Sequence, residues 1–198
     1  MKRGFTLIEL LIVIAILAII ATTIAVVMNP AQMLKEARDS QRMSDLKSIQ
    51  SALSLYLVSV SNPQMPKSGE SACKCTGKTG SGNVYAKDDT DGGFTSATCA
   101  ADNDITTDGT GWVAINLNDI PAGSPLSSLP LDPVNDDSSN GEGVDGGFYY
   151  IFGCSSSTLT FELNCNMEST KYSDLEGKDG GDNSNIYEIG SDPGLDLI

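Results

Sequence analysis

The chain begins with a long apolar run. From residue 10 to residue 28 its only polar side chains are Thr22 and Thr23. About nineteen residues in a helix extend roughly 28 Å, which is enough to cross the hydrocarbon core of a bilayer. Lys2 and Arg3 precede the run, and positive charge marks the cytoplasmic side of a membrane segment. The pattern therefore predicts one membrane-spanning helix, with the rest of the chain exported.

Residues 31–60 follow a different pattern, which predicts an amphipathic helix. Its apolar side chains recur at steps of three and four and form a stripe that another element must cover: Leu46, Ile49, Leu53, Tyr56, Leu57 and Val60. Charged side chains are assigned to the other face: Lys35, Glu36, Arg38, Asp39, Arg42, Asp45 and Lys47. Two interpretations of this charged face stay open, namely a solvated surface and salt bridges between subunits.

Proline marks both ends of the amphipathic helix. Asn29 can cap it with Pro30 at its first position, and Pro30 interrupts the preceding apolar helix because proline lacks a backbone N–H. Asn62-Pro63 and Pro66 end it. The sequence leaves open whether the chain bends or unwinds at Pro30.

The second half of the chain carries β signals. Residues 148–152 are aromatic and β-branched, residues 158–165 alternate apolar and polar, and three serines lie between them, which predicts a hairpin. A third strand is expected at 185–189, and residues 112–117 predict a short strand or a buried connector. Residues 61–110 have few apolar positions and predict a long variable loop. The predicted class is α+β, with a long N-terminal helix packed against a small antiparallel sheet.

Charge and composition narrow the range of possible functions. The chain has 12 basic and 26 acidic residues, a net charge of −14, and no histidine. This charge argues against a nucleic-acid partner, because phosphates need Lys and Arg to neutralise them. The sequence contains no nucleophile–base arrangement, phosphate-binding loop or redox motif. We therefore expect a protein that is not an enzyme.

Five cysteines follow the apolar run, and in an exported domain they predict disulfides. With the hairpin turn centred near Ser156, Cys154 faces Thr158, and its partner position lies seven residues, roughly 23 Å, from Cys165. A Cys154–Cys165 bridge is thereby excluded. We expect Cys165 to be a buried free thiol. The disulfide candidates are Cys73, Cys75, Cys99 and Cys154, with Cys154 joined to the 73–99 loop and Cys99 to Cys73 or Cys75. A zinc site made from the same cysteines is the rival interpretation.

An acidic loop raises the question of calcium. Residues 136–141 begin like an EF-hand loop, but Gly147 stands where that loop requires a bidentate glutamate, so it is not an EF-hand. Hard oxygen ligands are still available for a calcium ion, against the alternative of a solvated acidic turn. The candidate ligands are Asp132, Asn135, Asp136, Asp137 and Asp145.

The N-terminal residues GFTLIELLIVIAILAIIA resemble the prepilin signal of type IV pilins and type II secretion pseudopilins. A secretory signal peptide or plain anchor fits less well, because the run is long and contains Glu9 one turn inside it. The resemblance implies cleavage after Gly4 and N-methylation of the new N-terminal residue Phe5. It also implies that Glu9 pairs with the Phe5 amine of a neighbouring subunit. Cleavage would remove two of the 12 basic residues, Lys2 and Arg3, and lower the net charge to −16.

The resemblance also implies a function and its partners. We expect a structural subunit of a type IV pilus-like filament that assembles with itself. Its other implied partners are a prepilin peptidase and methylase, an inner-membrane assembly platform, and membrane lipid before assembly. It would cross the bacterial inner membrane once and then enter an extracellular or periplasmic filament. The alternatives are a major pseudopilin of a type II secretion system and a membrane-tethered adhesin that does not polymerise.

The resemblance suggests how the chain is divided. Residues 1–4 form the leader, 5–29 the transmembrane and assembly helix, 30–60 the amphipathic half of the helix, 61–128 a variable loop region, and 129–198 the sheet with C-terminal loops. Beyond residue 57 the resemblance weakens. Leu129–Pro133 followed by Phe148–Tyr150 is similar to a conserved region of major pseudopilins, with a long acidic loop in place of a short turn.

Overall fold

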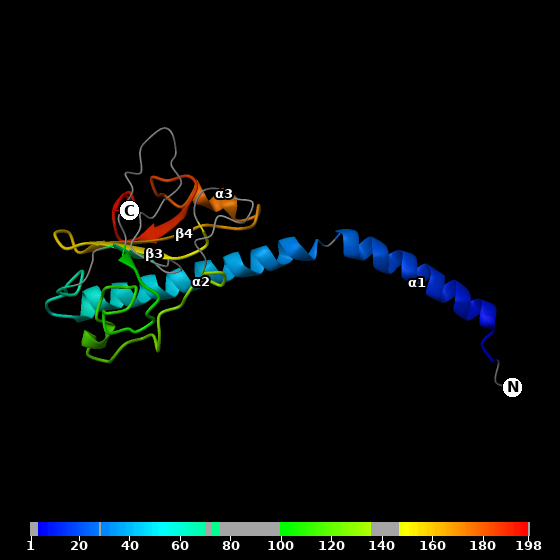
Figure 1. Cartoon of the computed structure of the whole chain (residues 1–198), viewed down its shortest axis with the longest axis horizontal. Helices are drawn as coiled ribbons and strands as arrows, with labels where there is room; N and C mark the ends of the chain where they lie inside the picture. The colour runs from blue at the N-terminus through cyan, green and yellow to red at the C-terminus, as the bar shows by residue number, and fades with distance from the viewer. Residues whose placement is uncertain (1–3, 28, 70–72, 76–99, 136–146, 198) are drawn as a thin grey trace.

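The computed structural model describes residues 4–27, 29–69, 73–75, 100–135 and 147–197. Two helices lead into a small head, which contains a five-stranded sheet (Figure 1). Helix α1 spans Leu7–Val27 and α2 spans Pro30–Ser59. The predicted α+β class, a long apolar N-terminal helix followed by a small antiparallel sheet, is confirmed.

The antiparallel part of the sheet consists of three strands. Strand β3 (Ile151–Ser155) pairs with β4 (Thr160–Cys165), and β4 pairs with β5 (Tyr187–Gly190). The hairpin and the third strand therefore lie where the sequence predicted them, within three residues at each boundary.

The hairpin register differs from the prediction. Four residues, 156–159, connect the strands, with Leu159 at a φ of 56°, so Cys154 pairs with Phe161 rather than with Thr158. Within the turn the Ser155 hydroxyl lies 3.0 Å from that of Ser157 and accepts from the Thr158 N–H at 3.4 Å, and the residue opposite Cys154 lies three positions later than predicted.

Two further strands extend the sheet within the region predicted to be a loop. Strand β1 (Cys73–Cys75) pairs antiparallel with β3, and β2 (Ala100–Ala101) pairs parallel with β1, which gives the order β2-β1-β3-β4-β5. Strands of two or three residues are too short to show an alternating pattern, so the sequence did not indicate these two strands within the long variable loop predicted over 61–110.

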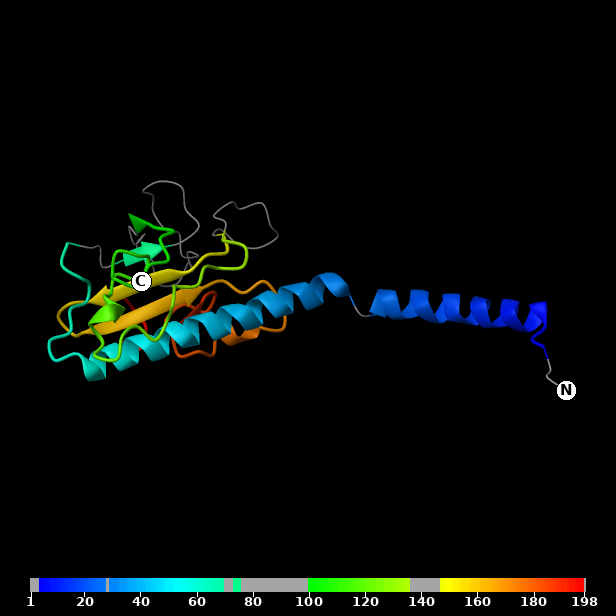
Figure 2. The ribbon, with the colours of Figure 1, turned by 90° about the horizontal axis from the view of Figure 1, so that it is seen from below.

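The head is a two-layer structure in which α2 lies along one face of the sheet (Figure 2). The predicted stripe of α2 faces this interface: Leu46, Ile49, Leu53 and Tyr56 are fully buried. From the sheet, Phe152, Phe161, Leu163 and Cys165 fill the same core. The short helices η1 (Leu117–Asp119) and α3 (Ser173–Glu176) complete the head.

Residues 112–117 are a buried connector, one of the two predicted alternatives. The Trp112 side chain is 0% exposed, its ring centroid is 5.8 Å from that of Tyr150, and its indole N–H donates to the Pro130 carbonyl at 3.0 Å. Gly111, the residue before this tryptophan, packs closely against the backbone of residue 106. A Cβ at position 111 would lie 2.3 Å from the Thr106 carbonyl oxygen. The tryptophan thus joins the connector to the strand side of the core.

We predict that Leu53→Ala destabilises the head by about 2–5 kcal/mol, because it removes a fully buried side chain and leaves a cavity. The matched control is Leu55→Ala two residues along the same helix, where the leucine is 43% exposed and the change should stay within about 0.5 kcal/mol. Urea unfolding followed by the fluorescence of Trp112, the single tryptophan, measures both. Equal losses of stability in Leu53→Ala and Leu55→Ala would contradict the packing of α2 described above.

Candidate functional site

Helix α1 has no cover in this structure. Its large apolar side chains from Leu7 to Ile24 are exposed, and none of the 18 residues in this window is buried. The window has a mean hydropathy of 2.9, so α1 is long and apolar enough to cross a membrane. The hydroxyls of Thr22 and Thr23 both donate to the Ile19 carbonyl, at 2.9 and 2.8 Å. Its two threonines are therefore satisfied within the helix, as a lipid environment requires.

The start of α1 holds the one acidic residue of this helix. The Glu9 carboxylate accepts hydrogen bonds from the Thr6 backbone N–H at 2.8 Å and the Thr6 hydroxyl at 2.7 Å. In return, the Glu9 N–H donates to the Thr6 hydroxyl oxygen at 3.3 Å. This is a capping box, in which two side chains satisfy the free N–H groups of a helix start. The Thr-x-x-Glu spacing could have revealed Thr6, which the sequence analysis did not single out.

The Gly4–Phe5 junction lies just before this cap. Phe5 is 81% exposed, and a Cβ built on Gly4 meets no atom within 4 Å. Neither residue contacts the head, so the peptide bond between them is open to another protein. The hydrogen bonds to Glu9 come from Thr6, which would remain in the chain after a cut between Gly4 and Phe5.

The break between the helices has the expected cap. Asn29 has a φ of 34° and lies in the left-handed region, its side chain accepts from the Gln32 N–H at 3.4 Å, and Pro30 opens α2. Left-handed backbone at Asn29 cannot continue a right-handed helix. Pro30 therefore begins a separate helix, and α1 leaves α2 at an angle in the view of Figure 1.

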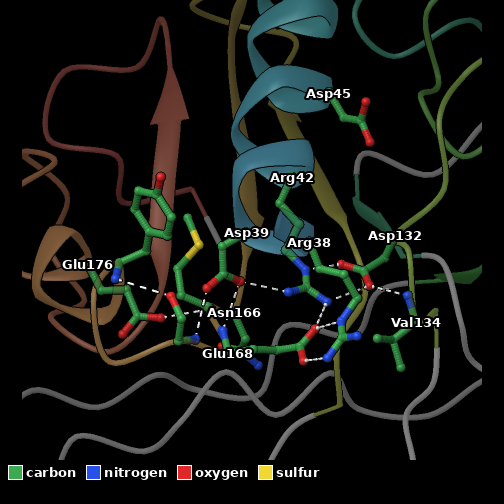
Figure 3. Close-up of polar contacts among 12 residues, drawn as sticks. Arg38, Asp39, Arg42, Asp45, Asp132, Val134, Asn166, Glu168 and Glu176 are labelled. Atoms are coloured by element: carbon green, nitrogen blue, oxygen red, sulfur yellow. Dashed lines mark hydrogen bonds and ion pairs between the residues drawn. The ribbon is translucent and has the colours of Figure 1, made fainter. Parts of the chain in front are cut away.

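A buried network of charges ties the first half of α2 to the head (Figure 3). Arg42 is 0% exposed and contacts three carboxylates. Its Nε and Nη2 donate to Asp132 at 2.6 and 2.9 Å, its Nη1 donates to Asp39 at 2.8 Å, and its Nη2 lies 2.7 Å from Glu168. Arg38 adds a second, bidentate pair with Glu168.

The carboxylates in turn hold backbone groups of the head. Asp39 accepts from the N–H groups of Glu168 and Ser169, at 2.9 and 2.8 Å, and Asp132 accepts from the Val134 N–H at 2.8 Å. One arginine thereby joins α2 to the segment after residue 129 and to the segment after β4. The Arg42 guanidinium also lies 4.8 Å from the centre of the Phe148 ring.

The charges in this network reinforce one another. Burial alone would lower the pKa of Arg42, but its contacts with Asp132 and Glu168 outweigh burial and raise that pKa above its ordinary value. Burial alone would raise the pKa of Glu168, and the hydrogen bonds from Arg38 and Arg42 lower it instead. Both groups are therefore ionised at neutral pH, as a buried ion pair requires.

This network overturns both interpretations of the charged face for Asp39 and Arg42. They are neither solvated nor available to a neighbouring subunit, because they are buried within the chain. Their positions continue the apolar stripe at the same steps of three and four: 39, 42, 46, 49, 53 and 56. The periodicity therefore indicated that Asp39 and Arg42 lie on the buried face, but the polarity of the two side chains led to their assignment to the outer face. Lys47, in contrast, is exposed as expected.

The cysteine predictions have mixed outcomes. Cys165 is a free thiol, 1% exposed, and burial raises its pKa well above the usual value. Cys154 is also a free, buried thiol, with its pKa raised to about 12 by burial, so the bridge expected for it is not formed. The register places Cys73 opposite Gly153 and Cys75 opposite Ile151. Cys99 lies outside the described residues.

The calcium candidates are not gathered into one site among the described residues. Asp132 is committed to Arg42, and Asn135 donates through Nδ2 to Asn103 at 3.2 Å. Asp136, Asp137 and Asp145 lie outside the described residues. Within the part of the chain that is described, no three acidic, histidine or cysteine side chains form a group that could hold a metal ion. Calcium binding at these five residues stays a prediction.

Comparison with known families matches one motif. The model described as "Prokaryotic N-terminal methylation motif", the prepilin signal of type IV pilins and pseudopilins, matches residues 1–25. No curated protein and no solved structure matches the chain. The match covers the Gly4–Phe5 junction, Glu9 and most of α1. It supports a pilin-like or pseudopilin precursor, a structural family rather than an enzyme family.

We predict that Arg42→Ala destabilises the head by about 3–5 kcal/mol, because three buried carboxylates lose their shared cation. Arg42→Lys should recover only part of this loss, since lysine keeps the charge but not the bidentate geometry. Lys47→Ala, which removes an exposed cation from the same helix, is the control. Urea unfolding at neutral pH measures the stability of all three variants. Equal stability of Arg42→Ala and Lys47→Ala would show that the network contributes nothing to the free energy of unfolding.

Proposed function

Because the chain carries the prepilin signal of type IV pilins and pseudopilins, we propose that it is the precursor of a structural subunit of a type IV pilus-like extracellular filament. A membrane peptidase cuts it after Gly4, and the new N-terminus at Phe5 is methylated. Helix α1 serves first as a single-pass anchor in the inner membrane and then as the core of the filament.

The observation that carries this proposal is the uncovered apolar helix with one carboxylate at its start. The described α1 side chains from Leu7 to Ile24 are exposed and, apart from Glu9, uncharged. Lipid can cover such a surface in the membrane, and only other apolar helices can cover it outside. A bundle of copies of α1 satisfies this requirement, because it buries the same apolar surface that lipid covered before.

Glu9 gives the bundle a register. A carboxylate among apolar helices needs a partner, and a capping threonine supplies hydrogen bonds but no charge. Cleavage after Gly4 creates a cationic amine at Phe5 on every subunit. Pairing of this amine with Glu9 of a neighbour neutralises both groups and permits one axial offset between subunits. The Thr6 cap holds Glu9 in place until the neighbouring amine arrives.

The head is suited to be a rigid unit at the end of this helix. The Arg42 network and the buried stripe fix α2 to the sheet, so force on α1 reaches the head through α2 rather than through a loop. The implied partners are then further copies of this chain, the peptidase and methylase, the assembly platform and membrane lipid.

A pseudopilin of a type II secretion system is the second candidate, and one observation favours it. Leu129–Pro133 and Phe148–Tyr150 resemble major pseudopilins, and this region is central to the head. Asp132 binds Arg42, and the Tyr150 hydroxyl donates to Asp45 at 2.9 Å. A pseudopilin stays in the periplasm and supports secretion, so surface filaments in electron micrographs would favour the pilus, and loss of protein secretion on deletion would favour the pseudopilus.

We predict that the mature protein begins at N-methylated Phe5, because the junction before it is exposed and lies within the matched motif. Intact mass and N-terminal sequencing of sheared extracellular or membrane material measure this. A mature start beyond residue 20 would overturn the proposal, because it would remove the assembly helix.

We further predict that Glu9→Ala is processed normally but fails to assemble, since the Phe5 amine loses its partner in the bundle. Thr22→Val is the control, because it removes a polar group that already bonds within α1. Immunoblots report processing, and the yield of sheared filaments reports assembly. Glu9→Ala filaments at wild-type yield would show that Glu9 does not set the register.

A further inference from the structure

Two glutamates that do not belong to the Arg42 network are buried on the outer face of the sheet. Glu162 in β4 and Glu188 in β5 are each 0% exposed. They alternate along their strands with the residues that face α2, and the register pairs Asn164 with Glu188. Two stretches near the end of the chain, residues 177–185 and 195–197, supply contacts to this pair and are called here the C-terminal loops.

One asparagine links the two carboxylates. Asn164 Nδ2 donates to Glu162 Oε1 at 2.7 Å and to Glu188 Oε1 at 3.5 Å. One side-chain amide therefore reaches one oxygen of each glutamate, which places the two carboxyl groups side by side on neighbouring strands.

The second oxygen of each glutamate holds a C-terminal loop. The Leu197 N–H donates to Glu162 Oε2 at 2.7 Å, and the Asn183 N–H donates to Glu188 Oε2 at 3.0 Å. Gly181 packs so closely that a Cβ there would lie 1.9 Å from Glu188 Oε2. Both loops are thus fastened to the sheet through the same pair of carboxyl groups.

No cation of the described residues balances the charge of this pair. Among the described residues neither glutamate forms an ion pair, and the charged groups that act on them from the loops, Asp179 and Asp182, are also acidic; Asp196 acts on Asp182 in the same sense. Burial raises the pKa of Glu162 to about 7 and that of Glu188 to about 9, and the charge of Glu162 adds to the rise at Glu188. Buried carboxyls without a cation take up a proton instead of remaining charged.

An unpaired acceptor lies at the same place. Asn164 is 0% exposed, and its Oδ1 has no hydrogen-bond partner. Its amide already lies between the two glutamates, so exchanging its oxygen and nitrogen would turn an acceptor toward a carboxyl O–H. A buried acceptor without a donor, next to two carboxyls without a cation, indicates that the missing component is a bound proton.

We infer that Glu162 and Glu188 share a proton and form a latch that holds the C-terminal loops on the outer face of the sheet. With both protons in place the pair is neutral, and after the first is lost one carboxyl still donates to the other and a single negative charge remains. Loss of the second proton leaves two adjacent carboxylates, which repel each other in a buried site. The loops then detach from the sheet, because opening admits water to both charges.

The direction of the pH dependence follows from linkage. Below the ordinary glutamate pKa of 4.5 both carboxyls are protonated whether the latch is closed or open. Between that pH and the raised values of about 7 and about 9, the closed state retains protons that the open state releases. The equilibrium constant for opening therefore rises with pH in this window, by up to about tenfold per pH unit for each titrating carboxyl, and levels off above it.

Amide hydrogen exchange on the full chain in detergent micelles tests this latch. The readouts are the protection factors of the Asn183 and Leu197 amides, with the Phe152 amide in β3 as a reference for the folded sheet. We expect protection at the first two sites to fall by at least about tenfold between about pH 5.5 and pH 8.5, while Phe152 stays protected. Flat protection at Asn183 and Leu197 over this range would overturn the inference.

Matched variants separate the proton from other causes. Glu188→Gln keeps the size of the side chain and supplies a permanent donor to Glu162, so it should remove most of the pH dependence and keep protection high at pH 8.5. Asp174→Asn, an exposed change in α3, should behave as wild type. If Glu188→Gln disturbs the Phe152 reference, Glu162→Gln gives the same test from the other strand. A second result would also overturn the inference: if millimolar calcium raised the protection of the wild-type protein at pH 8.5 to its level at pH 5.5, a metal ion and not a proton would join the pair.

Discussion

The structure depends on one buried arginine. Helix α1 extends away from the head without cover, so the orientation of the whole N-terminal half is set by how α2 is fixed to the sheet. Apolar packing of Leu46, Ile49, Leu53 and Tyr56 fixes the second half of α2. Arg42 fixes the first half, because its guanidinium reaches Asp132 and Glu168 from two different segments of the head. A hydrophobic contact there could slide, whereas a guanidinium with directed hydrogen bonds permits one geometry.

Buried carboxyl groups near α2 and on the outer face of the sheet are stabilised in opposite ways. Near α2, Asp39, Asp132 and Glu168 form ion pairs with Arg42 and Arg38, and the pKa of Glu168 is lowered. On the outer face, the donors to Glu162 and Glu188 in the described part of the chain are amides, and the pKa values of both glutamates are raised. The first arrangement gains from ionisation and the second from a proton. Glutamate therefore makes an ion pair that persists at neutral pH near α2, and a pH-sensitive contact on the outer face.

Much of the fold could be predicted from periodicity. The apolar run of α1, the stripe of α2, the Asn29-Pro30 boundary and the strands β3, β4 and β5 each leave a local pattern of burial or capping. Strands β1 and β2 could not be predicted, because two or three residues form a strand only when a neighbouring strand offers an edge, as β3 does for β1 and β1 does for β2. The hairpin register was missed because the turn is centred between Ser157 and Thr158 rather than on Ser156, which moves the partner of Cys154 by three residues, from Thr158 to Phe161.

The sequence by itself identified the N-terminal motif, because Gly4, Phe5 and Glu9 lie close together in one continuous segment of the chain. It did not determine which charges become buried. Arg42 meets Asp132 across 90 positions of the chain, and Glu162 meets the Leu197 N–H across 35. Only the tertiary structure brings such groups together, and burial decides whether a carboxyl there holds a cation or a proton. For the same reason the sequence did not indicate that Asp132 is a partner of Arg42.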